Sequence, residues 1–289
     1  SSTPGIFGSF FGPDPLSLLS VVILTSLGTW GLPQMVQKFY AIDNEDSIKK
    51  GTIISTIFAL VVSGGCYFLG GFGRLFSDKI DIAANGYDSI IPTMLENLHP
   101  LLIALVVILV LSASMSTLSS LIIASSSTLT IDLIKDNIVK EMSDKKQVFC
   151  IRVLIVIFIA ISAIIAIIQY KSAVTFIAQL MGISWGALAG SFLAPFLYSL
   201  YWKKTTKAAC WTSFIFGCII MVLNLVAGSH FPTLLQSPIN CGAFAMLAGL
   251  IIVPVVSLFT KKPDTALIEN TFACYDKTNT VTQKTALGK

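Results

Sequence analysis

The sequence predicts an all-α integral membrane protein with seven transmembrane helices. Three observations lead to this fold class: few charged residues, seven long apolar stretches, and basic residues that gather in alternate loops. Of the 289 residues, 54% are hydrophobic and 12% are charged, and the mean hydropathy is +0.82. Soluble domains carry about 25% charged residues. The composition therefore excludes a soluble enzyme and a nucleic-acid-binding protein, and the lipid bilayer is the first expected partner.

Seven stretches are apolar enough to cross the hydrocarbon core as helices, which takes about 20 residues. They are expected at Leu16–Val36, Gly51–Gly71, Leu101–Thr130, Val148–Ile168, Ser172–Leu200, Ala208–Ala227 and Ile239–Thr260. No Asp, Glu, Lys or His lies in the middle of any of them. Proton relays normally need such ionisable groups inside the membrane. Ion coupling in this chain is therefore expected to use neutral oxygen atoms.

The basic residues indicate which way the chain crosses the membrane. The loops after the first, third and fifth stretches, together with Arg152 at the start of the fourth stretch and the polar tail, hold 16 of the 19 basic residues. Arg74, Lys79 and Lys171 are the other three. Because basic residues concentrate on the cytoplasmic side, we expect the N-terminus outside and the C-terminus in the cytoplasm, in a plasma membrane. The chain begins at Ser1 without a signal peptide, which suggests the C-terminal piece of a longer transporter-like protein.

The first stretch is interrupted by Gly28, Gly31 and Pro33. Proline removes a backbone donor and clashes with the preceding turn, and the two glycines loosen the helix further. One interpretation is a discontinuous helix whose exposed backbone groups and half-helix ends bind a substrate or an ion at mid-depth. The alternative is an ordinary proline kink.

A face of small and hydroxylated residues lies in the third stretch. Ala113, Ser116, Thr117 and Ser120 follow one another at helical spacing and share one face. Two hydroxyl oxygens and a carbonyl one turn earlier form part of a shell of hard oxygen ligands. Without a carboxylate such a shell favours a monovalent cation. The alternative is close helix packing, with the hydroxyls bonded to carbonyls of their own helix.

Two segments outside the membrane complete the predicted organisation. Within Phe72–His99, the apolar residues Ile90–Leu95 predict either a short amphipathic helix, which in a transporter is a lid, or a plain loop. The tail Lys261–Lys289 is polar and is expected to be cytoplasmic, with little regular structure.

Three stretches, in this order along the chain, resemble motifs of the sodium/solute symporter family. Residues Gly31–Phe39 read G-L-P-Q-M-V-Q-K-F, similar to the G-Q-P-H-x-x-x-R-F of the family's broken sixth core helix. Residues Ala113–Ser119 read A-S-M-S-T-L-S, similar to A-x-M-S-T-x-S in the eighth. Residues Ser199–Lys207 read S-L-Y-W-K-K-T-T-K, similar to the S-L-Y-W-[KR]-[KR]-x-[TN] that ends the tenth.

The resemblance implies the second half of a five-plus-five inverted-repeat fold. Residues 1–207 are then the second repeat, core helices six to ten; residues 208–260 form two peripheral helices; and residues 261–289 are a cytoplasmic tail. It also implies a sodium site to which Ala113 contributes its carbonyl and Ser116 and Thr117 their hydroxyls. The remaining ligands are expected from the first core helix, which this chain lacks.

The resemblance further implies a solute site at the break, for which the expected lining is Thr25, Thr29, Trp30, Pro33 and Gln34. Proline-specific members tend to carry aromatic residues four and eight positions before this proline, where this chain has Thr29 and Thr25. The glutamine and histidine of the motif are Leu32 and Gln34. These departures leave the identity of the solute open.

The expected function is that of a sodium-coupled secondary transporter, a symporter that imports a small organic solute such as an amino acid, proline-like in character. It is not an enzyme, and it needs no cofactor beyond sodium as the coupling ion. Two alternatives stay open at this point. One is a transporter-like sensory or regulatory membrane module, and the other is an inactive fragment that lacks the first repeat.

Overall fold

The computed structural model describes residues 13–39, 42, 45–79, 86–139, 141–172 and 177–276. Every regular element within these ranges is a helix. The chain divides into two compact units, one formed by Ser1–Ile57 with Ile177–Lys289 and the other by Phe58–Phe176.

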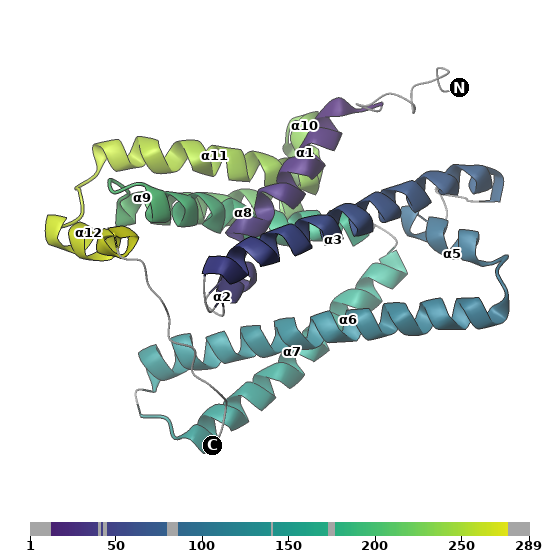
Figure 1. The fold of residues 1–289 in the computed structure, drawn as a ribbon, viewed down its shortest axis with the longest axis horizontal. Coiled ribbons are helices and arrows are strands. Elements are labelled where there is room, and N and C mark those ends of the chain that lie inside the picture. Colours follow the sequence, from purple (N-terminus) through teal and green to yellow (C-terminus); the bar gives the residue numbers. More distant parts are fainter. Residues whose placement is uncertain are drawn as a thin grey trace. The chain divides into compact units, whose positions relative to one another are not determined.

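Three long helices pack side by side in the first unit (Figure 1). They are α8 (Ile177–Tyr201), α9 (Lys207–Ala227) and α11 (Pro238–Phe259). Small residues let their backbones approach closely, as is usual between membrane helices. A Cβ atom on Gly186 of α8 would lie 2.8 Å from the Cα of Gly242 in α11. A Cβ atom on Gly217 of α9 would lie 2.6 Å from the carbonyl of Gly190 in α8.

Polar groups inside this bundle find partners on neighbouring helices. Pro254 lies inside α11 and has no N–H to offer the carbonyl one turn before it. The Tyr198 hydroxyl of α8 donates to that carbonyl, Leu250 O, at 2.8 Å. At the start of α9, the Thr206 side chain accepts from Ala209 N–H, and its hydroxyl lies 2.6 Å from that of Thr260. A hydrogen bond thus joins α8 to α11, and two hydrogen bonds of Thr206, to Ser257 and Thr260, join the start of α9 to the end of α11.

The N-terminal part of the first unit packs against this bundle. It consists of α1 (Pro15–Ser26), the 3-10 turn η1 (Gly28–Gly31) and α2 (Pro33–Phe39). Leu24 of α1 is fully buried in a cluster with Ala189 and Leu193 of α8 and Met246 of α11. Between α9 and α11 the chain forms η5 (Gly228–His230) and α10 (Thr233–Gln236).

The beginning of the C-terminal tail is folded, so the expectation of little regular structure is wrong for this part. The tail forms α12 (Thr265–Phe272) and η6 (Ala273–Asp276). The Tyr275 hydroxyl donates to Leu200 O at 2.9 Å, and Lys203 Nζ lies 5.5 Å from the centre of the Phe272 ring. These contacts attach the tail to the last turn of α8 and to the turn that follows it.

The second unit is built mainly from three long helices and their connections. These elements are α3 (Glu45–Phe72), whose first turns belong to the first unit, then η2 (Gly73–Lys79), η3 (Tyr87–Ser89), α5 (Ile90–Leu95), α6 (Pro100–Thr128), the π-helical segment η4 (Leu129–Ile138) and α7 (Asp144–Ser172). Helix α5 confirms the short helix expected over residues 90–95. It lies against η2, because a Cβ atom on Gly73 would be 2.7 Å from Cγ2 of Ile90.

Six helices in the described part of the chain are long and apolar enough to cross a membrane. They cover Asp46–Phe76, Pro100–Ile138, Asp144–Ile168, Gln179–Tyr201, Lys207–His230 and Pro238–Phe259. They correspond to the last six stretches expected from the sequence. The first expected stretch, Leu16–Val36, is instead divided among α1, η1 and α2. The count of seven spans therefore stays a prediction.

Candidate functional site

The helix break expected around Pro33 is present. Helix α1 ends at Ser26, η1 follows, and Leu32 adopts an extended conformation (φ −86°, ψ 116°) before α2 begins at Pro33. The ring of a proline excludes its preceding residue from the helical region, which explains the extended Leu32. The Leu32 carbonyl accepts from the N–H groups of Met35 (2.9 Å) and Val36 (3.2 Å). The helix is therefore interrupted rather than merely bent, and the binding of a substrate or an ion at this break stays a prediction.

One side of the break is pressed against α8. Gly28, Gly31 and Leu32 are buried there, next to the core around Leu24. A Cβ atom on Gly31 would lie 2.8 Å from the Cβ of Leu193 and 2.9 Å from its Cα. A residue larger than glycine therefore cannot occupy this position without moving the backbone. Close packing on this side holds the break in place.

The expected solute-lining residues lie on the other, more open side. Trp30 is 57% exposed, and Thr25, Thr29, Pro33 and Gln34 are half-buried. Thr25 and Thr29 follow one another at i and i+4, so they share a face of the chain. The structure therefore brings these five residues onto one break. That they bind a solute stays a prediction.

The hydroxyls of the two threonines are bonded to their own chain. Thr25 donates to Val21 O at 2.8 Å, and Thr29 donates to Ser26 O at 2.9 Å. Each oxygen keeps lone pairs that can accept a hydrogen bond from a ligand. Gln34 forms no hydrogen bond with any residue that the structure describes. Its amide offers both a donor and an acceptor.

The expected sodium ligands lie together in the middle of α6. Ala113, Ser116 and Thr117 are all exposed. The Ser120 hydroxyl donates to Thr117 O at 2.8 Å, but neither the Ser116 nor the Thr117 hydroxyl bonds to another described residue. Back-bonding of the kind described by the packing alternative is thus present at Ser120 but not at Ser116 or Thr117 within the described residues, and the sodium site stays a prediction. The Ser116 and Thr117 hydroxyls share one face of α6 with Ala113, which lies one turn earlier in the helix.

One buried polar residue further along α6 was not expected from the sequence. Ser126 is fully buried, and its Oγ atom has no hydrogen-bond partner among the described residues. Its carbonyl accepts from the Thr130 hydroxyl at 2.8 Å. The π-helical segment η4 begins three residues later, and such segments are frequent at functional sites. The serine run at 125–127 was the available signal, but a run of small polar residues is equally typical of helix packing.

The model of the sodium:solute symporter family matches residues 11–217, more than half of the chain. The chain belongs to the sodium:solute symporter family. The matched residues include the break at Pro33, the hydroxyl face of α6 and the bundle helix α8, and the match ends within α9. Membership in this family and the long apolar helices identify the chain as a multi-pass membrane protein, and the family is one of transporters and not of enzymes.

Several curated bacterial transporters are similar to this chain. The osmoregulated proline transporter OpuE of Bacillus subtilis is 26% identical over 261 residues, which is 90% of this chain and 51% of the relative. The high-affinity proline transporter PutP of Bacillus subtilis is 27% identical over 271 residues, 93% of this chain and 55% of the relative. A sodium/proline symporter of Staphylococcus aureus is 28% identical over 257 residues, 86% of this chain and 49% of the relative.

The chain spans about half the length of the curated relatives that it matches. No solved structure matches it. The family is therefore established by sequence, while the arrangement of the break and the α6 face comes from the fold described above.

Proposed function

We propose that the complete gene product couples inward sodium flow to the uptake of a small organic solute, an amino acid such as proline. The observation that carries this proposal is the family match, which spans both the helix break and the hydroxyl face of α6. The names of the similar bacterial proteins, which are proline transporters and a sodium/proline symporter, support the choice of solute class.

Sodium is held, in this proposal, by the Ala113 carbonyl and by the hydroxyls of Ser116 and Thr117. Hard neutral oxygens suit a hard cation, and without a carboxylate the site favours a single positive charge. The free hydroxyls of Ser116 and Thr117 support this assignment, because neither is committed to a carbonyl of its own helix. The other ligands come from a first repeat that is not part of this chain.

The solute binds at the open side of the break, beside Thr25, Thr29, Trp30, Pro33 and Gln34. Unwound backbone can offer polar groups to a solute inside a membrane only where a cavity or protein surrounds it. The packing of Gly31 against Leu193 supports this role, because it fixes the break while leaving the opposite side open.

The proposed architecture is the second half of a five-plus-five inverted repeat. Residues 1–207 supply core helices six to ten, residues 208–260 two peripheral helices, and residues 261–289 the cytoplasmic tail. The divided first helix makes a seventh span and places the N-terminus of this chain outside. Sodium binding stabilises the outward-open state, helix α5 closes as a lid, and the repeats then rock to release both solutes inside.

Uptake by the complete gene product in proteoliposomes tests the proposal. Radiolabelled proline is offered with an inward sodium gradient and, as the matched control, with an equal inward potassium gradient. We expect uptake with sodium only, and unlabelled proline or a close analogue to compete. Uptake of equal rate under both gradients contradicts sodium coupling. Sodium-driven uptake of another solute, without proline competition, contradicts only the choice of proline.

A further inference from the structure

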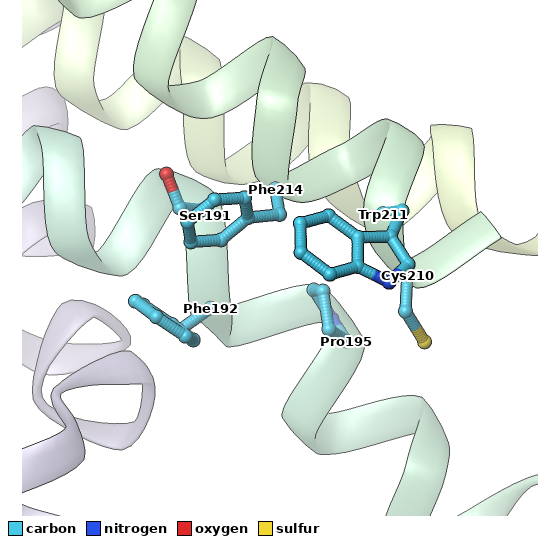
Figure 2. A pocket seen from close by; sticks show the side chains of 6 residues that line it. All are labelled: Ser191, Phe192, Pro195, Cys210, Trp211 and Phe214. Atoms are coloured by element: carbon cyan, nitrogen blue, oxygen red, sulfur yellow. The ribbon is translucent and has the colours of Figure 1, made fainter. Parts of the chain in front are cut away.

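A groove lies between α8 and α9 in the first unit. Its volume is about 350 Å³, at the lower end of the range of about 300–1,000 Å³ for ligand pockets. It is lined by Ser191, Phe192 and Pro195 of α8 and by Cys210, Trp211 and Phe214 of α9 (Figure 2). The Phe192 and Trp211 rings each contact Phe214 edge to face, with centroids 5.1 and 5.7 Å apart. The groove therefore has rigid aromatic walls.

The groove offers apolar contact and little else. The Ser191 hydroxyl lies 3.3 Å from the Cys218 sulfur, so its hydrogen bond is formed inside the protein. Pro195 has no N–H. Trp211 is 56% exposed, so the groove opens at the surface of two helices that are long enough to cross a membrane. The medium around such helices is lipid, and an acyl chain matches both the apolar lining and the open side.

A positive charge lies at one end of the same face. Lys207 is the first residue of α9, and Trp211 and Phe214 follow it at i+4 and i+7, so the three share one face of the helix. Lys207 is exposed and forms no ion pair with any residue that the structure describes. Lys203 and Lys204 lie in the turn just before it, and Lys203 is placed over the Phe272 ring. The groove is thus apolar along its length and cationic at its end.

We propose that this groove binds an anionic phospholipid, with one acyl chain between Pro195 and Trp211 and the headgroup phosphate against Lys207. Basic residues at the ends of membrane helices attract anionic headgroups, and lysine binds phosphate as a point charge. An aromatic residue beside a lysine also occurs as a simple interface anchor that prefers no particular lipid. A lipid-binding groove selects among headgroups, whereas a simple interface anchor does not. This proposal is independent of the transported solute.

Quenching of Trp211 fluorescence by brominated lipid tests the proposal. The complete protein is reconstituted in phosphatidylcholine vesicles that contain an equal, small fraction of brominated phosphatidylglycerol or of brominated phosphatidylcholine. The contribution of Trp211 is the difference between the wild type and Trp211→Phe, which keeps an aromatic ring beside Phe214. We expect phosphatidylglycerol to quench Trp211 at lower mole fractions than phosphatidylcholine does.

Two charge variants locate the headgroup. Lys207→Gln should weaken the preference for phosphatidylglycerol by about fivefold, the effect of one positive charge near a membrane surface. Lys262→Gln removes the same charge after the end of α11, which lies beside the start of α9, and should leave the preference unchanged. Equal quenching by the two brominated lipids overturns the proposal. An equal loss in both lysine variants overturns it as well, because it reveals general surface attraction.

Discussion

Replacing Gly31 with alanine probes the packing that holds the helix break. The added Cβ would lie 2.8 Å from Leu193 Cβ and 2.9 Å from both Leu193 Cα and Leu193 N. Because the opposing atoms are backbone and Cβ, no side-chain rotation relieves the clash, and truncating Leu193 to alanine does not either. Overpacking of this kind costs about 1–3 kcal/mol. For chains of about 150–250 residues each kcal/mol lowers Tm by about 2–4 °C.

We therefore expect Gly31→Ala to lower Tm by about 5 °C in detergent, measured by thermal unfolding of the purified protein. Gly28→Ala is the matched control in the same turn. A Cβ at Gly28 would meet Ala189 Cβ at 3.6 Å and Met246 Cε at 3.7 Å, which are ordinary contacts. This variant should keep the wild-type Tm or raise it slightly. Equal Tm values for the two variants would refute the close approach of the break to α8.

Three further substitutions test other contacts. Tyr198→Phe removes the hydrogen bond to Leu250 O, one turn before Pro254, and should lower the free energy of unfolding by about 1–3 kcal/mol, seen as a lower Tm. Tyr201→Phe changes an exposed ring and should leave the Tm unchanged in the same thermal melt. Thr206→Ala removes the N-cap of α9 and should lower the free energy of unfolding by about 1 kcal/mol, seen as a lower Tm. An unchanged Tm would show that this cap does not stabilise the protein. Tyr275→Phe removes the bond to the end of α8, so limited proteolysis should cleave the tail faster, and an unchanged rate would show that this bond does not hold α12.

The expectations that the structure confirms rest on local signals. The long apolar stretches correspond to the membrane-length helices, because a membrane span needs only about 20 consecutive apolar residues. The interruption of the first stretch follows from Pro33 and the two glycines just before it. The short helix α5 likewise follows from a run of six residues. In each case the physical cause lies within one or two turns of its effect.

Contacts between distant residues were not predictable in the same way. Tyr198 and Leu250 are 52 positions apart, and nothing in either neighbourhood indicates that one supplies the hydrogen bond missing at Pro254. The tail was expected to lack structure because it is polar, yet Tyr275 and Phe272 attach it to α8. Pairing across the fold depends on the packing of whole helices, which hydropathy does not encode. The proposed roles of Ser116 and Thr117 on α6 and of the helix break depend in the same way on partners outside their own helices.

The sodium dependence of uptake tests the central claim most directly. Uptake of labelled proline by the complete gene product is measured against sodium concentration for the wild type, Ser116→Ala, Thr117→Ala and Ser114→Ala. Ser116→Ala and Thr117→Ala each remove one proposed ligand oxygen. A polar contact to a charge is worth about 1.5–3 kcal/mol, so half-saturation of uptake should need at least about tenfold more sodium in these two variants. Ser114 is on the same helix but off the face shared by Ala113, Ser116 and Thr117, so its variant should keep the wild-type curve. Unchanged sodium activation in Ser116→Ala and Thr117→Ala, or an equal shift in Ser114→Ala, would contradict a sodium site on α6.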